Sequence, residues 1–138
     1  MYFLLKTLSP ELIYIRWYAA KQPACQPQTA FIAHVRQRLD ETTTPLYFLS
    51  DLRFGRIQDV SVIQQLAGLT HHPNWGGSAA FSENLISQIM VGSFTRLRRS
   101  PEPPSRRELF TKPEEAIASL EHLKAGLTTD IDWTVTLA

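Results

Sequence analysis

The first part of the chain alternates apolar and more polar residues with the two-residue period of a β-strand. Residues 2–8 (YFLLKTL) and 12–19 (LIYIRWYA) are rich in aromatic and β-branched side chains, and the turn-forming residues SPE separate them. We therefore predict a β-hairpin. In its second strand Ile13, Ile15 and Trp17 occupy alternate positions, so we expect these three side chains to face the core.

A helical period follows the hairpin and a polar loop. Residues 29–41 (TAFIAHVRQRLDE) place apolar side chains on one face, which predicts an amphipathic helix with Thr29 as its N-cap. Residues 46–52 (LYFLSDL) form a nearly continuous apolar run, which is typical of a central strand covered on both faces. Residues 59–72 (DVSVIQQLAGLTHH) return to helical spacing, and PNWGG ends this second helix.

The second half of the chain continues the alternation of strands and helices. Residues 112–124 (KPEEAIASLEHLK) predict a helix, because Pro113 falls in the first turn and acidic residues follow it. The other predicted elements are a short strand at 78–82 (SAAFS), a long apolar helix at 83–99 (ENLISQIMVGSFTRLRR), a short strand at 106–111 (RRELFT) and a last strand at 133–137 (WTVTL).

This order of elements predicts one α/β domain over residues 1–138, with a core at 2–124 and a tail at 125–138. We expect an N-terminal β-hairpin followed by alternating helices and strands, with about five strands and four helices in all. Right-handed crossovers then give a mixed, mostly parallel sheet with helices packed on it.

The composition is that of an ordinary globular domain. Of the 138 residues, 43% are hydrophobic and 20% are charged, which suffices for one core without metal or disulfide. The single cysteine, Cys25, cannot form an internal disulfide, which favours a reducing compartment. The opening MYFLLK is too short for a signal peptide, and no stretch approaches the ~20 apolar residues of a membrane span. We therefore predict a cytoplasmic protein without a membrane span.

Positive charge is concentrated in one segment. Residues 96–107 (RLRRSPEPPSRR) hold five arginines against one glutamate, while the whole chain has a net charge of +1. The prolines predict an exposed loop rather than a recognition helix, and the segment has no aromatic residues that could stack on bases. We interpret it as a solvated loop and expect no nucleic-acid partner.

The chain offers no recognisable catalytic or metal-binding set. It lacks the G-x-S-x-G turn of hydrolases and the glycine spacing of phosphate-binding loops. His71 and His72 are adjacent on a predicted helix, so their side chains point about 100° apart and rarely share one ion. We predict a non-enzymatic protein with no metal and no cofactor.

Three segments together carry a family resemblance. They are the hairpin YFLLKTLSPELIYIRWYA, the strand-to-helix junction YFLSDLRFGRIQDVSVIQQL, and HPNWGG before a strand and an apolar helix, followed by RRELFTKPEEAIASLEHL. Over residues 2–124 the chain resembles the STAS-type fold of bacterial anti-sigma-factor antagonists, and more closely the SpoIIAA-like family of short bacterial proteins. The resemblance implies regulation through binding to another protein.

In the antagonist proteins the junction carries an Asp-Leu pair and then Asp-Ser-Ser-Gly, whose second serine is phosphorylated by a partner kinase. The resemblance matches Asp51 and Leu52 to the first pair. It matches Asp59 to the second aspartate and Ser61 to the phospho-acceptor.

Two positions of the junction depart from that pattern. Val60 replaces the first serine, and Val62 replaces the glycine that lets a partner's active site approach the backbone closely. A phosphate on Ser61 would add about −1.5 to −2 charge at a helix N-terminus, where anions are well accepted. The residues themselves favour a simpler interpretation, in which Asp59 is an N-cap and Ser61 only belongs to the first turn.

We predict a STAS-like regulatory or protein-interaction domain that works through the surface of residues 53–62. Its expected partner is another protein, with a second copy of the chain as the alternative. The residues predicted to bind the partner are Asp51, Arg53, Asp59 and Val62, with Ser61 as the candidate phospho-acceptor.

A second hypothesis uses the predicted helix at 83–97. Its apolar stripe, which includes Ile86, Met90 and Phe94, would line a pocket for a small apolar ligand or a lipid. A stripe of this kind is also expected of a helix that simply packs on a sheet, and a cavity for a long lipid would take volume that a small core needs. An enzyme of unknown reaction is the third hypothesis.

Overall fold

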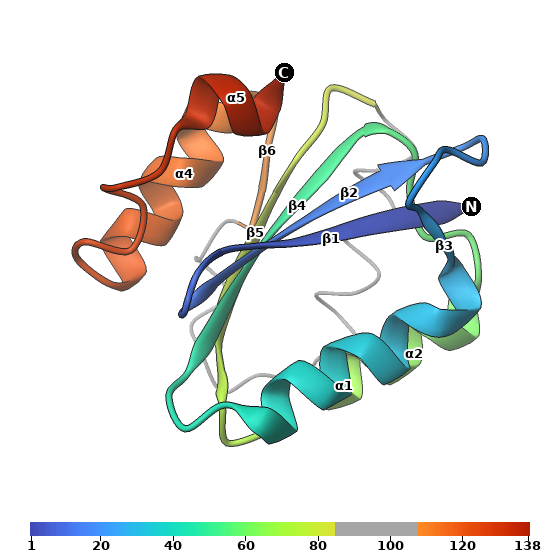
Figure 1. Cartoon of the computed structure of the whole chain (residues 1–138), viewed down its shortest axis with the longest axis horizontal. Coiled ribbons are helices and arrows are strands. Elements are labelled where there is room, and N and C mark those ends of the chain that lie inside the picture. Colours follow the sequence, from blue (N-terminus) through green and yellow to red (C-terminus); the bar gives the residue numbers. More distant parts are fainter. Residues whose placement is uncertain (85–107) are drawn as a thin grey trace.

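The computed structural model describes residues 1–84 and 108–138. A central sheet lies between two helical layers, α1 with α2 on one face and α4 with α5 on the other (Figure 1). The strands are β1 (Tyr2–Ser9), β2 (Leu12–Tyr18), β3 (Gln26–Pro27), β4 (Leu46–Phe54), β5 (Trp75–Phe81) and β6 (Leu109–Phe110). The helices are the 3-10 turn η1 (Gln28–Ala30), α1 (Phe31–Glu41), α2 (Val60–Leu69), α4 (Pro113–Leu123) and α5 (Trp133–Leu137).

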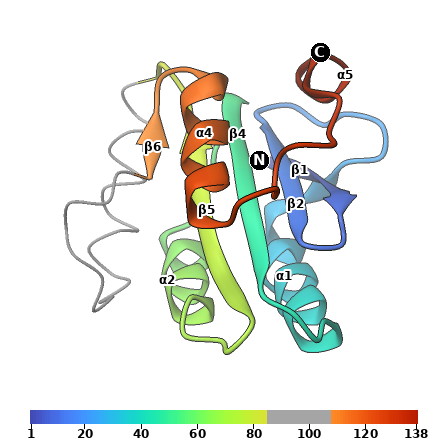
Figure 2. The ribbon, with the colours of Figure 1, turned by 90° about the vertical axis from the view of Figure 1, so that its left-hand side faces the viewer.

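The sheet is mixed and has the order β3-β1-β2-β4-β5-β6. β1 and β2 form the predicted antiparallel hairpin, whereas β2, β4, β5 and β6 run parallel to one another (Figure 2). The short β3 adds an antiparallel edge beside β1, which the sequence did not predict. The predicted mixed α/β architecture with a mostly parallel sheet is therefore confirmed, with six strands among residues 1–84 and 108–138 where about five were predicted.

Two apolar cores lie on opposite faces of the sheet. Ile13, Ile15 and Trp17 face the core under α1 and α2, as predicted. Their alternate neighbours Leu12 and Tyr14 are also buried, in the core under α4. β2 lies between β1 and β4 and is covered on both faces. Its alternate side chains therefore enter two different cores, instead of one set entering a core and the other facing solvent.

The predictions of a buried strand at β4 and of a helix after it, α2, are confirmed. β4 places Phe48 in one core and Leu49 in the other, as expected of a central strand. α2 begins after Asp59, whose side chain caps it. Pro113 occupies the first turn of α4, where its missing N–H costs no hydrogen bond.

Two boundary predictions are wrong. Thr29 does not cap α1, because η1 precedes the helix and Ala30 is its N-cap, without a side-chain hydrogen bond. β5 begins at Trp75 rather than at 78, so the glycines of PNWGG belong to the strand. A Cβ on Gly76 would lie 2.7 Å from the ring of Tyr47, which explains why a side chain is absent there.

The segment predicted as a tail with a last strand is a packed helix instead. Asp132 Oδ1 accepts the N–H of Val135 at 3.1 Å and caps α5. Leu127 and Thr136 are buried, so residues 125–138 belong to the fold. The capped turn and the contact with the core outweigh the strand propensity of the threonine and valine residues.

Two predicted elements fall on residues that the structure does not describe: most of the long helix at 83–99 and the arginine-rich segment at 96–107. Among the described residues, no helix has both the length and the apolarity needed to cross a bilayer.

Candidate functional site

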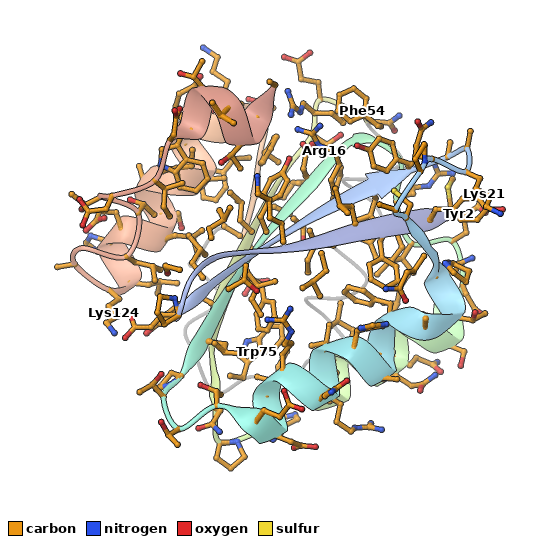
Figure 3. All side chains as sticks on the ribbon, in the orientation of Figure 1. Tyr2, Arg16, Lys21, Phe54, Trp75 and Lys124 are labelled. Carbon is orange, nitrogen blue, oxygen red and sulfur yellow. The ribbon has the colours of Figure 1, made fainter. Side chains whose placement is uncertain are left out.

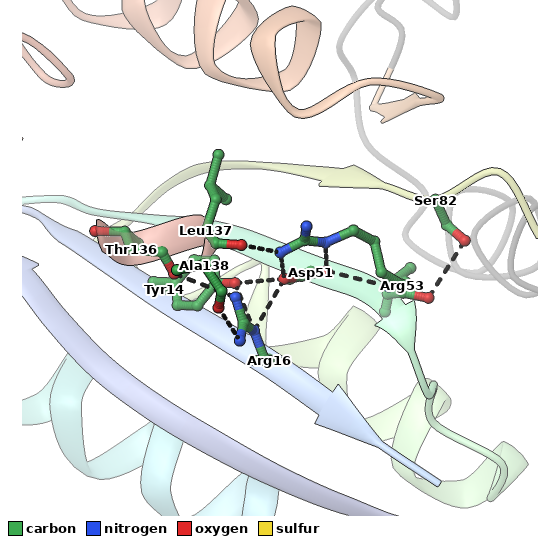
Figure 4. Close-up of polar contacts among 9 residues, drawn as sticks. Tyr14, Arg16, Asp51, Arg53, Ser82, Thr136, Leu137 and Ala138 are labelled. Carbon is green, nitrogen blue, oxygen red and sulfur yellow. Dashed lines mark hydrogen bonds and ion pairs between the residues drawn. The ribbon is translucent and has the colours of Figure 1, made fainter. Parts of the chain in front are cut away.

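A buried carboxylate organises the carboxyl ends of β2 and β4. Asp51 is fully buried. Its Oδ2 accepts hydrogen bonds from Arg16 Nε at 3.1 Å and Arg53 Nη2 at 2.7 Å, and also from the hydroxyl of Tyr14 (Figure 4). Its Oδ1 accepts from Nε of Arg53 at 2.9 Å and from the backbone N–H of Arg53 at 3.1 Å. We call these four residues the Asp51 cluster.

Strand geometry brings the Asp51 cluster together. Tyr14 and Arg16 alternate on β2, and Asp51 and Arg53 alternate on β4, so each pair points to one face of the sheet. Arg16 and Asp51 are direct partners in the parallel register of these two strands. All four side chains consequently lie on the face covered by α4 and α5.

The contacts hold each member of the Asp51 cluster in one protonation state. Burial alone would raise the pKa of Asp51, but hydrogen bonds from Arg53 and Tyr14 hold that pKa below its ordinary value. Burial, together with the hydrogen bond to Asp51, raises the pKa of the Tyr14 hydroxyl. At neutral pH the cluster therefore contains one carboxylate, two guanidinium groups and a neutral phenol. Such a set suits binding and positioning rather than proton transfer.

The two arginines also hold the end of α5. Arg16 donates from Nη1 to the main-chain oxygen of Ala138 at 3.0 Å and from Nη2 to that of Thr136 at 3.2 Å. Arg53 Nη2 donates to the main-chain oxygen of Leu137 at 2.9 Å. The main-chain oxygens of three successive residues thus face the two guanidinium groups (Figure 4).

Phe54 continues this site to the surface at the end of β4. Its side chain is 48% exposed, and its ring stacks on that of Tyr18 with centroids 6.0 Å apart. The guanidinium carbons of Arg16 and Arg53 lie 5.2 and 5.1 Å from the ring centre, within cation–π range. Figure 3 shows Arg16 and Phe54 at the same end of the sheet. Contacts from several directions therefore hold an exposed aromatic ring in place.

The β4–α2 junction follows directly. Asp59 Oδ1 accepts the N–H of Ser61 at 2.8 Å, which confirms the predicted N-cap. The Gln28 side chain accepts the N–H groups of Gln58 and Asp59 and fixes the loop before the helix. Ser61 is exposed, and its hydroxyl accepts a hydrogen bond from Gln65 at 3.2 Å. The hydroxyl is accessible, and its phosphorylation stays a prediction.

The structure separates the residues predicted to bind a partner. Arg53 and Asp59 are exposed. Asp51 and Val62 are buried, Val62 in the core under α1 and α2, so neither side chain can contact a partner in this conformation. For these two residues the prediction needs correction. They support the junction from the interior: Asp51 accepts hydrogen bonds from Arg53, and Val62 packs in the core. Ile86, Met90 and Phe94 lie outside the described residues.

Sequence reasoning missed Tyr14, Arg16 and Phe54 as parts of the site. A signal was present for one of them, Arg16. An aspartate inside the apolar run at 46–52 is costly to bury unless a cation pairs with it. Arg16, which interrupts another apolar strand, was the natural partner. The exposure of Phe54 depends on where β4 ends, and the local sequence pattern does not indicate the end of this strand.

A small cavity lies between the sheet and the helices α1 and α2. Its volume is about 70 Å³, and aromatic side chains contribute much of its described lining. An engineered cavity of roughly 150 Å³ admits benzene, so this one is too small for a ligand of that size. Its lining includes Trp17, Phe31, Phe48 and Trp75, with Ser50, Ser78 and Glu108 as polar members.

The predicted absence of a metal rests on the sequence. Within residues 1–84 and 108–138, no three His, Cys, Asp or Glu side chains gather as ligands of an ion. The Nε2 atom of His72 instead lies 2.8 Å from Oδ1 of Asp40, and its Nδ1 accepts a hydrogen bond from the backbone N–H of Asn74.

The fold and the site define a mixed α/β protein with a polar cluster at the carboxyl ends of its central strands. No protein-family model, curated protein or solved structure matches the chain. The STAS-type resemblance therefore stays a prediction.

Proposed function

We propose that this chain is a non-enzymatic, STAS-like protein-interaction domain of the SpoIIAA-like kind. Its docking surface would be Arg53, Phe54, Asp59, Val60 and Ser61, which we call the junction surface. One observation carries the proposal. Two large apolar side chains, Phe54 (48% exposed) and Val60 (61% exposed), are presented to solvent on either side of one strand-to-helix loop.

The composition of the junction surface suits protein binding. Among the described residues, only one other large apolar side chain is exposed, Val135 on α5. Aromatic residues and arginine are enriched among the residues that dominate interface energies. Phe54 is already fixed by Tyr18 and by two guanidinium groups, so little side-chain entropy is lost when a partner covers it.

Ser61 would supply the switch. Its hydroxyl is exposed on the first turn of α2, next to Val60. A phosphate there is compatible with the helix N-terminus and leaves the fold intact. It places about −1.5 to −2 charge beside the apolar contact, and a partner surface matched to Val60 would have to desolvate that charge.

The arrangement favours interaction over the other two hypotheses. The charge states of the Asp51 cluster are fixed at neutral pH, so its members are poor acids and bases for catalysis. The described cavity under α1 and α2, of about 70 Å³, is too small for a lipid, whereas the predicted helix of the ligand hypothesis lies outside the described residues. The hairpin followed by the parallel β4–α2 unit is the order that the resemblance to the antagonist family requires.

The test is a pull-down from a lysate of the source cells, followed by affinity measurement with the captured protein. We expect Phe54→Ala and Val60→Ser each to weaken binding at least about tenfold, as loss of a central interface contact does. Ser61→Asp should abolish capture, whereas Ser61→Ala should retain it. Val135→Ser is the matched control, because it removes an equally exposed valine from another helix.

The proposal fails if the junction variants, shown to be folded, capture the same protein as strongly as the wild type. It also fails if Val135→Ser weakens capture as much as Val60→Ser, because the contact would then not be specific to the junction surface.

A further inference from the structure

We infer that Arg16 and Arg53 form an oxyanion-binding site, for a phosphate or carboxylate group, and that the end of α5 covers this site. The site lies on the α4 and α5 face of the sheet and shares only Arg53 with the junction surface. The main-chain oxygens of Thr136, Leu137 and Ala138 occupy the positions that the oxygens of the anion would take.

Charge is the first reason. The Asp51 cluster contains two guanidinium groups and one carboxylate, since Tyr14 is neutral, and therefore has a net charge of +1. Both Asp51 oxygens are already engaged by the arginines. Of the remaining donors, Nη2 of each arginine faces the carbonyl oxygen of Thr136 or Leu137, which carries only partial charge. Hydrogen bonds from guanidinium to an ionised oxygen are roughly twice as strong as those to a neutral one.

Preorganisation is the second reason. The Asp51 carboxylate holds Arg16 Nε at 3.1 Å and Arg53 Nη2 at 2.7 Å, so both guanidinium groups keep their positions without help from α5. The side chains are 11% and 32% exposed in the presence of α5. An anion would find its donors already in place, which lowers the entropy cost of binding.

The small size of α5 is the third reason. The helix spans five residues, Trp133–Leu137. It is held by the Asp132 cap, by a hydrogen bond from Trp133 Nε1 to the main-chain oxygen of Thr128 at 3.1 Å, and by the packing of Trp133 and Leu137 against the core under α4. Helices this short are marginal without tertiary contacts. In Figure 1 α5 lies at the outer end of its layer, so it can leave the arginines while α4 stays on the sheet.

The test titrates the full chain with inorganic phosphate at fixed ionic strength, and NMR follows the side chains of Arg16 and Arg53. Loss of an N-cap makes the open state of a helix about fivefold more populated. While the open state is a minor one, the apparent affinity rises with its population. We therefore expect Asp132→Ala to bind phosphate about fivefold more tightly than the wild type.

Two control variants separate helix opening from charge. Asp132→Asn removes the same charge but keeps a capping oxygen, and Asp59→Ala removes a charged N-cap from α2 instead. Both should bind phosphate like the wild type. Arg53→Lys in the Asp132→Ala background keeps the charge but loses the planar fork, and should weaken binding about tenfold.

Hydrogen exchange supplies the second readout. Since phosphate and α5 would compete for the same donors, phosphate must accelerate amide exchange at Thr136 and Ala138 in the wild type. Trp133→Ala, which removes the bond to Thr128, should act like Asp132→Ala. An acetate titration then separates the sources: equal response to acetate indicates a carboxylate-bearing partner, and a response to phosphate alone indicates a phosphorylated ligand.

Three results would overturn the inference. One is unchanged phosphate affinity in a variant whose α5 exchange shows that the helix has opened. Another is a wild-type chain in which phosphate leaves α5 exchange unchanged or slows it. The third is full phosphate binding by the Arg53→Lys variant.

Discussion

Arg16 on β2 and Asp51 on β4 are register partners on neighbouring parallel strands, and Arg16 Nε lies 3.1 Å from Asp51 Oδ2. The carboxylate is fully buried, whereas the guanidinium reaches outward to the end of α5. This pair therefore connects the centre of the sheet with the helix that covers its carboxyl edge. Its replacement should affect stability more than most single changes on the surface.

Asp51→Asn should destabilise the protein by about 3 kcal/mol, since it leaves two guanidinium groups beside each other without a counter-charge. Urea unfolding followed by tryptophan fluorescence measures the change. Asp130→Asn, at an exposed position, is the control and should change the free energy of unfolding by less than about 0.5 kcal/mol. A loss of similar size in both variants would contradict the structural role of Asp51.

Stability should depend on pH through Asp51. Its pKa is lower in the folded state than in the unfolded state, so the contribution of its ionised form is complete above the ordinary carboxyl range, near pH 4. That contribution is lost as the pH falls through the folded-state pKa. The difference in melting temperature between the wild type and Asp51→Asn should therefore be constant from pH 7 to about 5 and shrink towards pH 2. A difference that stays constant to pH 2 would show that Asp51 is not the titrating group.

Two glycine substitutions should act in opposite directions. A Cβ on Gly55 would lie 2.5 Å from the carbonyl carbon of Tyr18, so Gly55→Ala must move backbone and should cost about 2–3 kcal/mol. Gly68 lies within α2 with nothing within 4 Å of such a Cβ, so Gly68→Ala should add about 0.5–1 kcal/mol. Thermal unfolding of the two variants checks both signs. A stable Gly55→Ala protein would mean that β2 and β4 separate easily at this end.

A negative charge at position 61 should leave the fold intact. Ser61 is on the first turn of α2, where an acidic side chain is favoured by about 0.3–1 kcal/mol. Ser61→Asp should melt at or above the wild-type temperature by circular dichroism, and Ser61→Lys should melt below it. The reverse order would mean that the charge of Asp59 dominates this helix end, and loss of partner binding by Ser61→Asp could then reflect damage to the helix.

Local patterns were sufficient for the elements whose signals lie within a few residues. The hairpin, the buried run of β4 and the Asp59 cap of α2 all follow from the order of neighbouring side chains. The same patterns predict a strand at residues 133–137, because threonine and valine favour one, whereas the cap from Asp132 and the contact with the core make this segment a helix.

The sequence by itself determined the class of fold, since the periods of apolar residues select strand or helix and their order restricts the sheet. The tertiary structure alone decided how the site is assembled. Arg16 contacts Asp51, 35 positions away in the sequence, and Ala138, 122 positions away, and Phe54 is exposed at the last position of β4. Contacts between distant segments depend on strand register and helix packing, which no local pattern records.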